Sequence, residues 1–235
     1  MTGAMPVMIM AAGRGERMRP LTDSRPKPLL EVAGKPLLAY HLERLADAGF
    51  SRVVVNLAYL GDQIETWLGD GSRFGMRVRY SREPEGALET GGGMRHALPL
   101  LGPGPFMVVN GDVWTDYPFV QLREFTLADK DLAHLVMVPN PPQHPEGDFV
   151  LNNGRLSQGD CERLTYSGIG VYRAELVAGE RPDRFPLAPL LIQAMNQGRV
   201  SGECYRGGWD DIGTPARLEA LAQRLQAPAR RAVDR

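Results

Sequence analysis

Buried strands are predicted wherever a short apolar run is bounded by turn residues. Runs of this kind cover residues 7–10, 52–57, 76–80, 106–112, 133–139, 166–172 and 200–205. Between them, apolar positions recur at helical spacing, as at Leu38, Leu42 and Leu45. This spacing predicts helices over 36–49, 61–68, 94–98, 119–128, 187–197 and 215–225. Strands that alternate with helices indicate βαβ units, and therefore an α/β fold with a mainly parallel sheet.

Two glycine-containing segments modify this alternation. Residues 149–151 and 155–157 flank Asn152-Asn153-Gly154, and an Asn-Gly turn between extended segments predicts a β-hairpin. Gly168 and Gly170 lie inside the alternating segment 166–172. Because glycine weakens an ordinary strand, these two positions indicate that another group approaches the backbone closely.

The composition is typical of a soluble globular protein and narrows the possible functions. A formal net charge of -1 argues against a broad nucleic-acid-binding face. Cys161 and Cys204 are too few for a disulfide framework, and their spacing fits no zinc site, so we expect a reducing, cytoplasmic compartment. No stretch approaches the roughly 18 apolar residues of a membrane span. We expect a single domain over 7–226, with flexible termini at 1–6 and 227–235.

The first strand leads into the most informative stretch of the chain, residues 11–28. Gly13 and Gly15 let the backbone bend tightly and approach a ligand, because no Cβ stands in the way. Successive N–H groups in such a loop can bind an anion, and Arg17 and Lys27 add positive charge. We therefore predict a phosphate-binding loop at the carboxyl end of the first strand, and we expect Lys27 to be solvated.

Two common phosphate-binding motifs do not match this loop. Met18 stands where a dinucleotide-binding Gly-x-Gly-x-x-Gly motif has its third glycine, and no Gly-Lys-Ser/Thr follows. The sequence is instead Gly-x-Gly-x-Arg-Met-x-Pro-Leu-Thr at 13–22, followed by Pro-Lys-Pro at 26–28. This long string resembles the signature of the sugar-phosphate nucleotidyltransferases. The resemblance spans about residues 7–225 and implies that family's GT-A-like fold, a Rossmann-like three-layer sandwich around a mainly parallel mixed sheet.

Two aspartates follow strand-like segments. Asp112 comes after the apolar run 106–109, and Asp211 lies in Trp-Asp-Asp-Ile-Gly-Thr at 209–214. From the residues alone, these could be an Asn-Gly-Asp turn and a strand end before a capped helix. The resemblance implies instead that both carboxylates bind Mg²⁺, with Asp210 as the second choice for the later ligand. Two carboxylates can hold this hard cation against substrate phosphates.

The resemblance also implies the substrate contacts. Expected nucleotide contacts are Ala11, Ala12, Gly13, Gly15, Arg17, Lys27, Glu85, Glu89, Thr90 and Gly91. Expected sugar contacts are Asn110, Ser167 and Gly168. Arg17, Lys27 and Asp112 are expected to act on the reacting phosphates. The glycines at 91–93 stand just before the predicted helix 94–98, where they could let a flat ring or a phosphate approach closely.

The implied reaction is nucleotidyl transfer from a nucleoside triphosphate to a sugar 1-phosphate, with catalysis by positioning and charge neutralisation. The short chain and its Leu-Glu-Thr-Gly-Gly-Gly segment are most similar to the uridylyltransferases that use UTP and N-acetylmuramic acid 1-phosphate in bacterial peptidoglycan recycling. Mannose-1-phosphate guanylyltransferases are the alternative, and a non-catalytic nucleotide-sugar-binding regulatory protein is a further one. The residues do not separate uracil from guanine, or a monomer from a small homo-oligomer.

Overall fold

The computed structural model describes residues 5–84, 87–179 and 182–227. Its strands are β1 (Val7–Met10), β2 (Glu31–Val32), β3 (Lys35–Pro36), β4 (Arg52–Leu57), β5 (Arg77–Arg82), β6 (Phe106–Asn110), β7 (Val113–Thr115), β8 (Ala133–Val138), β9 (Phe149–Asn152), β10 (Arg155–Ser157), β11 (Arg163–Tyr172), β12 (Val200–Cys204) and β13 (Trp209–Asp211). Its α-helices are α1 (Leu37–Asp47), α2 (Gly61–Leu68), α3 (Glu89–Leu101), α4 (Val120–Glu124), α5 (Ala188–Asn196) and α6 (Pro215–Gln226).

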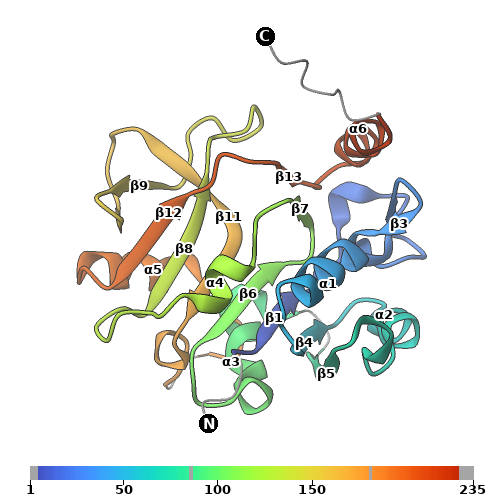
Figure 1. Ribbon diagram of the computed structural model, residues 1–235, viewed down its shortest axis with the longest axis horizontal. Coiled ribbons are helices and arrows are strands. Elements are labelled where there is room, and N and C mark those ends of the chain that lie inside the picture. The colour runs from blue at the N-terminus through green and yellow to red at the C-terminus, as the bar shows by residue number, and fades with distance from the viewer. Residues whose placement is uncertain (1–4, 85–86, 180–181, 228–235) are drawn as a thin grey trace.

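A mixed sheet runs through the molecule (Figure 1). Within the described ranges it has nine strands, in the order β5-β4-β1-β6-β11-β8-β12-β10-β9. The first four are parallel neighbours, and β8 and β12 are also parallel to each other. Strand β11 runs antiparallel between β6 and β8, and β9 and β10 form the predicted hairpin. This arrangement confirms the predicted α/β class and its mixed sheet.

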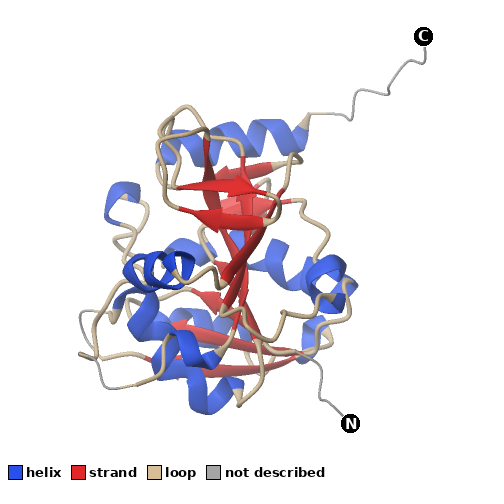
Figure 2. Ribbon diagram, turned by 90° about the vertical axis from the view of Figure 1, so that its left-hand side faces the viewer, coloured by secondary structure: helices blue, strands red, loops and turns tan. Residues whose placement is uncertain are grey.

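Helices cover both faces of the sheet and complete a three-layer sandwich (Figure 2). Apolar side chains of α1, α2 and α4 pack on one face, where they meet Val7, Ile9 and Val55. Apolar side chains of α3 and α5 pack on the other face against Met8 and Val108. The strands thus present apolar side chains to both faces of the sheet, as expected when helices cover both faces.

A smaller structural unit lies beside this sandwich. Strand β13 pairs antiparallel with β7, and helix α6 follows it directly. Leu221 of α6 packs with Trp114, Met18 and Ile212 in a third apolar cluster. The C-terminal helix is therefore fastened to the loop that follows β1, although some 200 residues separate them in the sequence.

Helix α3 differs from the prediction because it begins at Glu89 and so includes the three glycines. A Cβ at Gly91 would stand 2.5 Å from the Phe185 ring, and one at Gly92 would collide with the carbonyl of Asp183. The Gly92 N–H donates to the Phe185 carbonyl, at 3.1 Å. Gly91 and Gly92 therefore allow the segment around Phe185 to pack against the helix, whereas Gly93 makes room for the side chains of Glu83 and Asn56.

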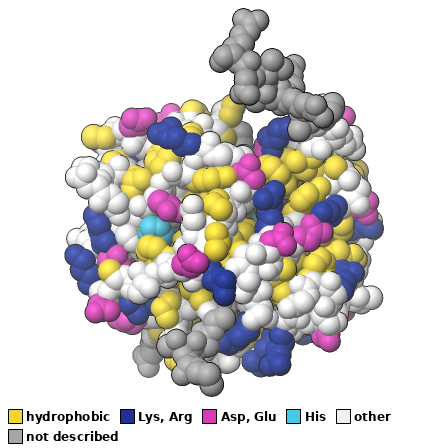
Figure 3. All heavy atoms as spheres, viewed as in Figure 1, with side chains coloured by type: hydrophobic (Ala, Val, Ile, Leu, Met, Phe, Trp, Pro, Cys, Tyr) yellow, Lys and Arg dark blue, Asp and Glu magenta, His cyan; other side chains and the backbone are white. Residues whose placement is uncertain are grey.

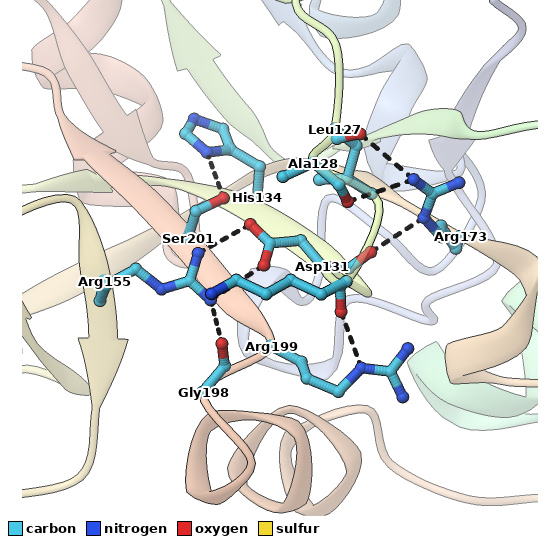
Figure 4. A network of polar contacts seen from close by, with 10 residues as sticks. Leu127, Ala128, Asp131, His134, Arg155, Arg173, Gly198, Arg199 and Ser201 are labelled. Atoms are coloured by element: carbon cyan, nitrogen blue, oxygen red, sulfur yellow. Dashed lines mark hydrogen bonds and ion pairs between the residues drawn. The ribbon is translucent and has the colours of Figure 1, made fainter.

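A polar network lies at the amino-terminal ends of β8 and β12 (Figure 4). Because these strands run parallel to β6, the network lies at the opposite end of the strands from the carboxyl ends of β1 and β6. Asp131 is 2% exposed, and its two carboxylate oxygens accept hydrogen bonds from Arg155 at 2.7 and 2.9 Å. Arg155 also donates to the Gly198 carbonyl. Burial acts to raise the pKa of Asp131, but its bonds to Arg155 and Ser201 hold that pKa below the usual value.

The surface carries charges of both signs. On the face drawn in Figure 3, basic and acidic side chains are interspersed, which agrees with the near-zero net charge. Among the described residues, no helix has the length and apolar character needed to cross a membrane. The termini expected to be flexible lie almost wholly outside the described residues.

Candidate active site

A cavity of about 380 Å³ opens at the carboxyl ends of β1 and β6. The predicted site residues that line it are Ala11, Ala12, Gly13, Gly15, Arg17, Lys27, Glu89, Thr90, Asn110 and Asp112. Gly91, Ser167, Gly168 and Asp211 are not among its lining residues, and Glu85 lies outside the described residues. The carboxyl end of a parallel sheet is where α/β proteins bind their ligands.

The two glycines of the first loop, Gly13 and Gly15, have different surroundings and different structural roles. Gly15 has a φ of 68°, in the left-handed region that favours glycine. A Cβ there would stand 3.1 Å from the Thr22 side chain and 3.3 Å from Lys27 Cβ. At Gly13, by contrast, no described heavy atom lies within 4 Å of the position of a Cβ. Gly15 is therefore needed by the fold, whereas Gly13 leaves space in the cavity wall.

Lys27 forms the ion pair at the centre of the site. It lies in a one-turn 3-10 helix at Lys27–Leu29, and its side chain is 8% exposed. Its Nζ stands 2.7 Å from Oδ2 of Asp112, which is 41% exposed. The expectation of a solvated lysine was therefore wrong, because the loop folds over the side chain and buries it beside Gly15. Both members of the pair line the cavity, so the ammonium and the carboxylate lie where phosphate groups and a cation could bind.

Asp211 is brought next to Asp112 by the backbone of β13. The Ile212 N–H donates to the Asp112 carbonyl at 2.9 Å, which holds the backbone segments of the two aspartates side by side. The Asp211 carboxylate is ion-paired with Arg217 of α6, with Nη1 and Oδ2 2.7 Å apart. The neighbouring Asp210 pairs instead with Arg224.

The donor set of these two aspartates fits a hard cation. Both groups are carboxylates, and each forms an ion pair with one basic side chain, Lys27 for Asp112 and Arg217 for Asp211. Mg²⁺ is commonly bound through one or two carboxylates together with substrate phosphates. Among the described residues, no group of three or more acidic, histidine or cysteine side chains is placed to hold a metal. A cation held by Asp112 and Asp211 would therefore need substrate phosphates or water as further ligands.

Arg17 also lines the cavity. It is exposed, and within the described part of the chain it has no hydrogen bond or ion pair. Its Nη2 stands 3.2 Å from the position that a Cβ of Gly213 would take. An arginine without a carboxylate partner at the rim of a cavity is suited to bind a phosphate in a bidentate manner.

His41 of α1 contacts the segment that carries Asp112. It is buried and hydrogen-bonded to the backbone of Val113, the residue after Asp112. Burial lowers the pKa of His41 to about 4, although the Val113 bond and the charge of Asp112 act in the opposite direction. The imidazole is therefore neutral near pH 7, and the positive charge that faces Asp112 comes from Lys27.

Two cavity residues that the sequence analysis missed are Asn56 and Glu83. The Ala11 N–H donates to Asn56 Oδ1 at 2.6 Å, and Asn56 Nδ2 donates to Glu83 Oε1 at 2.6 Å. The other carboxylate oxygen of Glu83 accepts from the Leu88 N–H, at 2.8 Å. This chain of hydrogen bonds links the first loop to the start of α3. Both residues stand at or just beyond the carboxyl ends of parallel strands, a signal that could have identified them.

The predicted sugar contacts are arranged around one bulge. Gly168 has a φ of +79° where the β11 register shifts, and a Cβ there would stand 2.6 Å from the Asn110 side-chain nitrogen. Asn110 lines the cavity. The Ser167 hydroxyl is buried and donates to the Val136 carbonyl at 2.6 Å, while the Ser167 carbonyl accepts from the Trp209 indole at 2.9 Å. Gly168 thus makes room for Asn110, and Ser167 braces the strand.

A comparison with known families identifies the chain as a nucleotidyltransferase. A model of the nucleotidyl transferase family matches residues 6–151, and the chain belongs to that family. The matched segment includes the first loop, Lys27, Asp112 and the Asn56–Glu83 link. It ends before β13 and Arg217.

Individual relatives are similar over nearly the whole chain. The chain is 52% identical over 221 residues to the N-acetylmuramate alpha-1-phosphate uridylyltransferase of Neisseria meningitidis, covering 92% of this chain and 96% of that protein. It is 36% identical to the protein of the same name from Caulobacter vibrioides, over 94% and 97% of the two lengths. It is 41% identical to the mannose-1-phosphate guanylyltransferase catalytic subunit beta of Drosophila melanogaster, over 88% of this chain but 59% of that protein.

A solved structure shows the same fold. A chain from Bacillus anthracis, described as a glucose-1-phosphate thymidylyltransferase and solved with sucrose, superposes with a TM-score of 0.83. The superposition covers 96% of each chain at 19% sequence identity. The nucleotidyltransferase fold expected from the sequence is thereby confirmed.

Proposed function

We propose that this chain transfers UMP from UTP to N-acetylmuramic acid 1-phosphate, which gives UDP-N-acetylmuramic acid and pyrophosphate. The chain covers almost the full length of the two relatives named as N-acetylmuramate alpha-1-phosphate uridylyltransferases, which supports this substrate pair over GTP and mannose 1-phosphate. The observation that carries the proposal is the buried Lys27 ammonium, held 2.7 Å from Asp112 at the cavity that the first loop forms.

In the proposed reaction the sugar phosphate attacks directly, and the protein forms no covalent bond with either substrate. An anionic oxygen of the sugar 1-phosphate bonds to the α-phosphorus of UTP, and the bond from that phosphorus to the bridging oxygen of the β-phosphate breaks. The electron pair of that bond leaves with pyrophosphate. Because the attacking oxygen already carries negative charge, no general base is required, and the protein acts by positioning and charge neutralisation.

The basic residues neutralise the phosphates in this proposal. Lys27 places a point charge beside the reacting phosphates, because it is fixed by burial and by its pair with Asp112. Arg17 binds the β- and γ-phosphates and stabilises the departing pyrophosphate, since its planar guanidinium can hold two phosphate oxygens at once. The backbone N–H groups around Gly13 contribute further donors.

Asp112 and Asp211 are the residues that would hold Mg²⁺. The bound ion would supply charge neutralisation between the phosphates of the two substrates. The ion pair with Lys27 supports this role for Asp112, and the Ile212–Asp112 backbone bond, which holds the segments of the two aspartates together, supports it for Asp211.

The two ends of the cavity divide the remaining contacts. Ala11 and Ala12 adjoin Asn56, and Glu89 and Thr90 follow Leu88, which is bonded to Glu83; we assign these lining residues to the nucleotide base. Asn110, oriented over Gly168, is assigned to the sugar side. In this proposal the enzyme works in cytoplasmic peptidoglycan recycling.

A pyrophosphate-release panel tests the substrate assignment. UTP, GTP, CTP and dTTP are each combined with the 1-phosphates of N-acetylmuramic acid, N-acetylglucosamine and mannose, in the presence of Mg²⁺. The highest turnover is expected with UTP and N-acetylmuramic acid 1-phosphate. Preference for GTP with mannose 1-phosphate would overturn the substrate assignment, and silence across the panel would overturn the proposed activity.

A further inference from the structure

Arg217 occupies an unusual position for a residue of a C-terminal helix. It lies one turn into α6, where its N–H and its Nε both reach Oγ1 of Thr214, the residue that caps the helix, at 3.4 Å. Its Nη1 is 2.7 Å from Asp211 Oδ2. The two side chains are only 23% and 29% exposed. The guanidinium is therefore held directly against one of the two carboxylates that could bind a divalent cation.

A second arginine approaches the same place. A Cβ at Gly213 would collide with Nη2 of Arg217 and would stand 3.2 Å from Nη2 of Arg17. Gly213 and Arg17 line the cavity. Arg217 is not a lining residue itself, but its guanidinium stands directly behind Gly213 and next to that of Arg17. Asp211 neutralises Arg217, whereas Arg17 has no ion pair within the described residues. Two neighbouring cations with a single carboxylate leave one positive charge for an anion to compensate.

We propose that Arg217 exchanges partners during the binding of substrate. It pairs with Asp211 while that carboxylate has no divalent cation. When Asp211 binds the cation, Arg217 turns to the phosphates beside Arg17. This inference rests on the proposed nucleotidyl transfer and adds Arg217 as a phosphate-binding residue that also competes with the cation for Asp211.

The exchange couples two binding events. A cation that binds alone must displace Arg217 and leave its guanidinium beside Arg17, which is unfavourable. If phosphates are present, the displaced guanidinium gains a new anionic partner. Cation and phosphates therefore strengthen each other's binding, and linkage requires the effect to be equal in both directions.

The chain provides a matched control in Arg224. It lies on the same helix and pairs with Asp210, the other aspartate of β13, with Nη1 and Oδ1 3.2 Å apart. Its guanidinium also lies over the Trp114 ring, 5.0 Å from the centroid. Neither Arg224 nor Asp210 lines the cavity, and Arg224, unlike Arg217, is not among the nearest groups to a Cβ at the lining residue Gly213. Arg224→Gln thus removes a comparable ion pair of α6 without touching the site.

The first measurement is Mn²⁺ binding in the absence of nucleotide, followed by the electron paramagnetic resonance signal of the free ion. Arg217→Gln is expected to bind Mn²⁺ about tenfold more tightly than the wild type, because Asp211 loses its competing charge. Arg224→Gln and Arg217→Lys are expected to stay near the wild-type affinity. Circular dichroism verifies that each variant is folded.

The second measurement is calorimetric binding of inorganic pyrophosphate at saturating Mg²⁺. Here Arg217→Gln is expected to bind about tenfold more weakly, since a charged donor is lost. Opposite changes in the two affinities support the exchange. Unchanged or weaker Mn²⁺ binding by Arg217→Gln, or unchanged pyrophosphate binding, overturns it.

The variant Asp112→Asn distinguishes a failure of the proposed Arg217 exchange from a failure of the proposed function. If Asp112→Asn abolishes Mn²⁺ binding but Arg217→Gln leaves it unchanged, the metal site stands and only the role of Arg217 is refuted. If Asp112→Asn binds Mn²⁺ like the wild type, the metal site is refuted, and the exchange falls with it.

Discussion

Replacing Lys27 by methionine removes one buried charge while it keeps the length of the aliphatic stem beside Gly15. The ammonium has a half-exposed partner, Asp112, which water can solvate once the lysine is gone. An ion pair with one exposed member contributes about 1 kcal/mol or less to stability, and removing a buried charge offsets part of that loss. The free energy of unfolding should therefore change by no more than about 1 kcal/mol.

Activity should respond far more strongly to the same substitution. Loss of one preorganised charge that faces the reacting phosphates costs about 10²–10³-fold in turnover, or about 2.7–4 kcal/mol in the activation free energy. Lys27→Met is measured by pyrophosphate release at saturating substrates and by urea unfolding. Lys35→Met is the control, because Lys35 pairs with Glu43 at 2.5 Å on the surface and is not among the cavity-lining residues.

Two outcomes would refute this reasoning. Turnover of Lys27→Met within about threefold of the wild type would show that the ammonium does not act on the phosphates. A loss of more than about 3 kcal/mol in the free energy of unfolding would show that the lysine is chiefly a structural residue. Lys35→Met should change neither quantity appreciably.

Three further predictions concern other parts of the molecule. Asp112→Asn should lower turnover by about two to three orders of magnitude in a folded protein, and a near-normal rate would remove it from the site. Gly168→Ala should lower the free energy of unfolding by about 1–3 kcal/mol, because alanine is strained at this positive φ and its Cβ meets Asn110; thermal unfolding measures this, and an unchanged midpoint would contradict it. Asp131→Asn leaves Arg155 without a carboxylate partner and should cost about 2 kcal/mol at pH 7. Because the folded pKa of Asp131 lies below its unfolded value of about 4, this difference should be complete above pH 4 and shrink as the pH falls through the folded pKa. Urea unfolding from pH 7 down to pH 3 tests the sign, and a difference that grows in acid would contradict the assignment.

Local pattern was sufficient for much of the sheet and its helices. Strand β4 and helix α2 have the predicted bounds, 52–57 and 61–68, because each is a regular apolar pattern between clear turn residues. The hairpin at 149–157 also follows from local turn chemistry. The start of α3 did not follow from local pattern, since Gly91 and Gly92 are explained by a segment about 90 residues later in the chain, and Gly93 by Glu83 and Asn56.

The site shows the same division between local and distant causes. The first loop and Asp112 could be located from residues that are close in sequence. The burial of Lys27 could not, because it depends on how the loop folds over the side chain. Arg217 was also missed, although its position, one turn after the Thr214 cap and six residues after Asp211, could have suggested that it returns to the aspartate. Asn56 was missed because its partners, Ala11 and Glu83, follow two different strands, β1 and β5.

The most direct test of the central claim is a crystal structure with UDP-N-acetylmuramic acid and Mn²⁺, in which the ion is located by its anomalous signal. We predict a peak bound by the Asp112 and Asp211 carboxylates, with the diphosphate against the loop at 11–17 and Lys27. A peak away from these aspartates, or a nucleotide bound outside the cavity, would contradict the assignment of this site to nucleotidyl transfer.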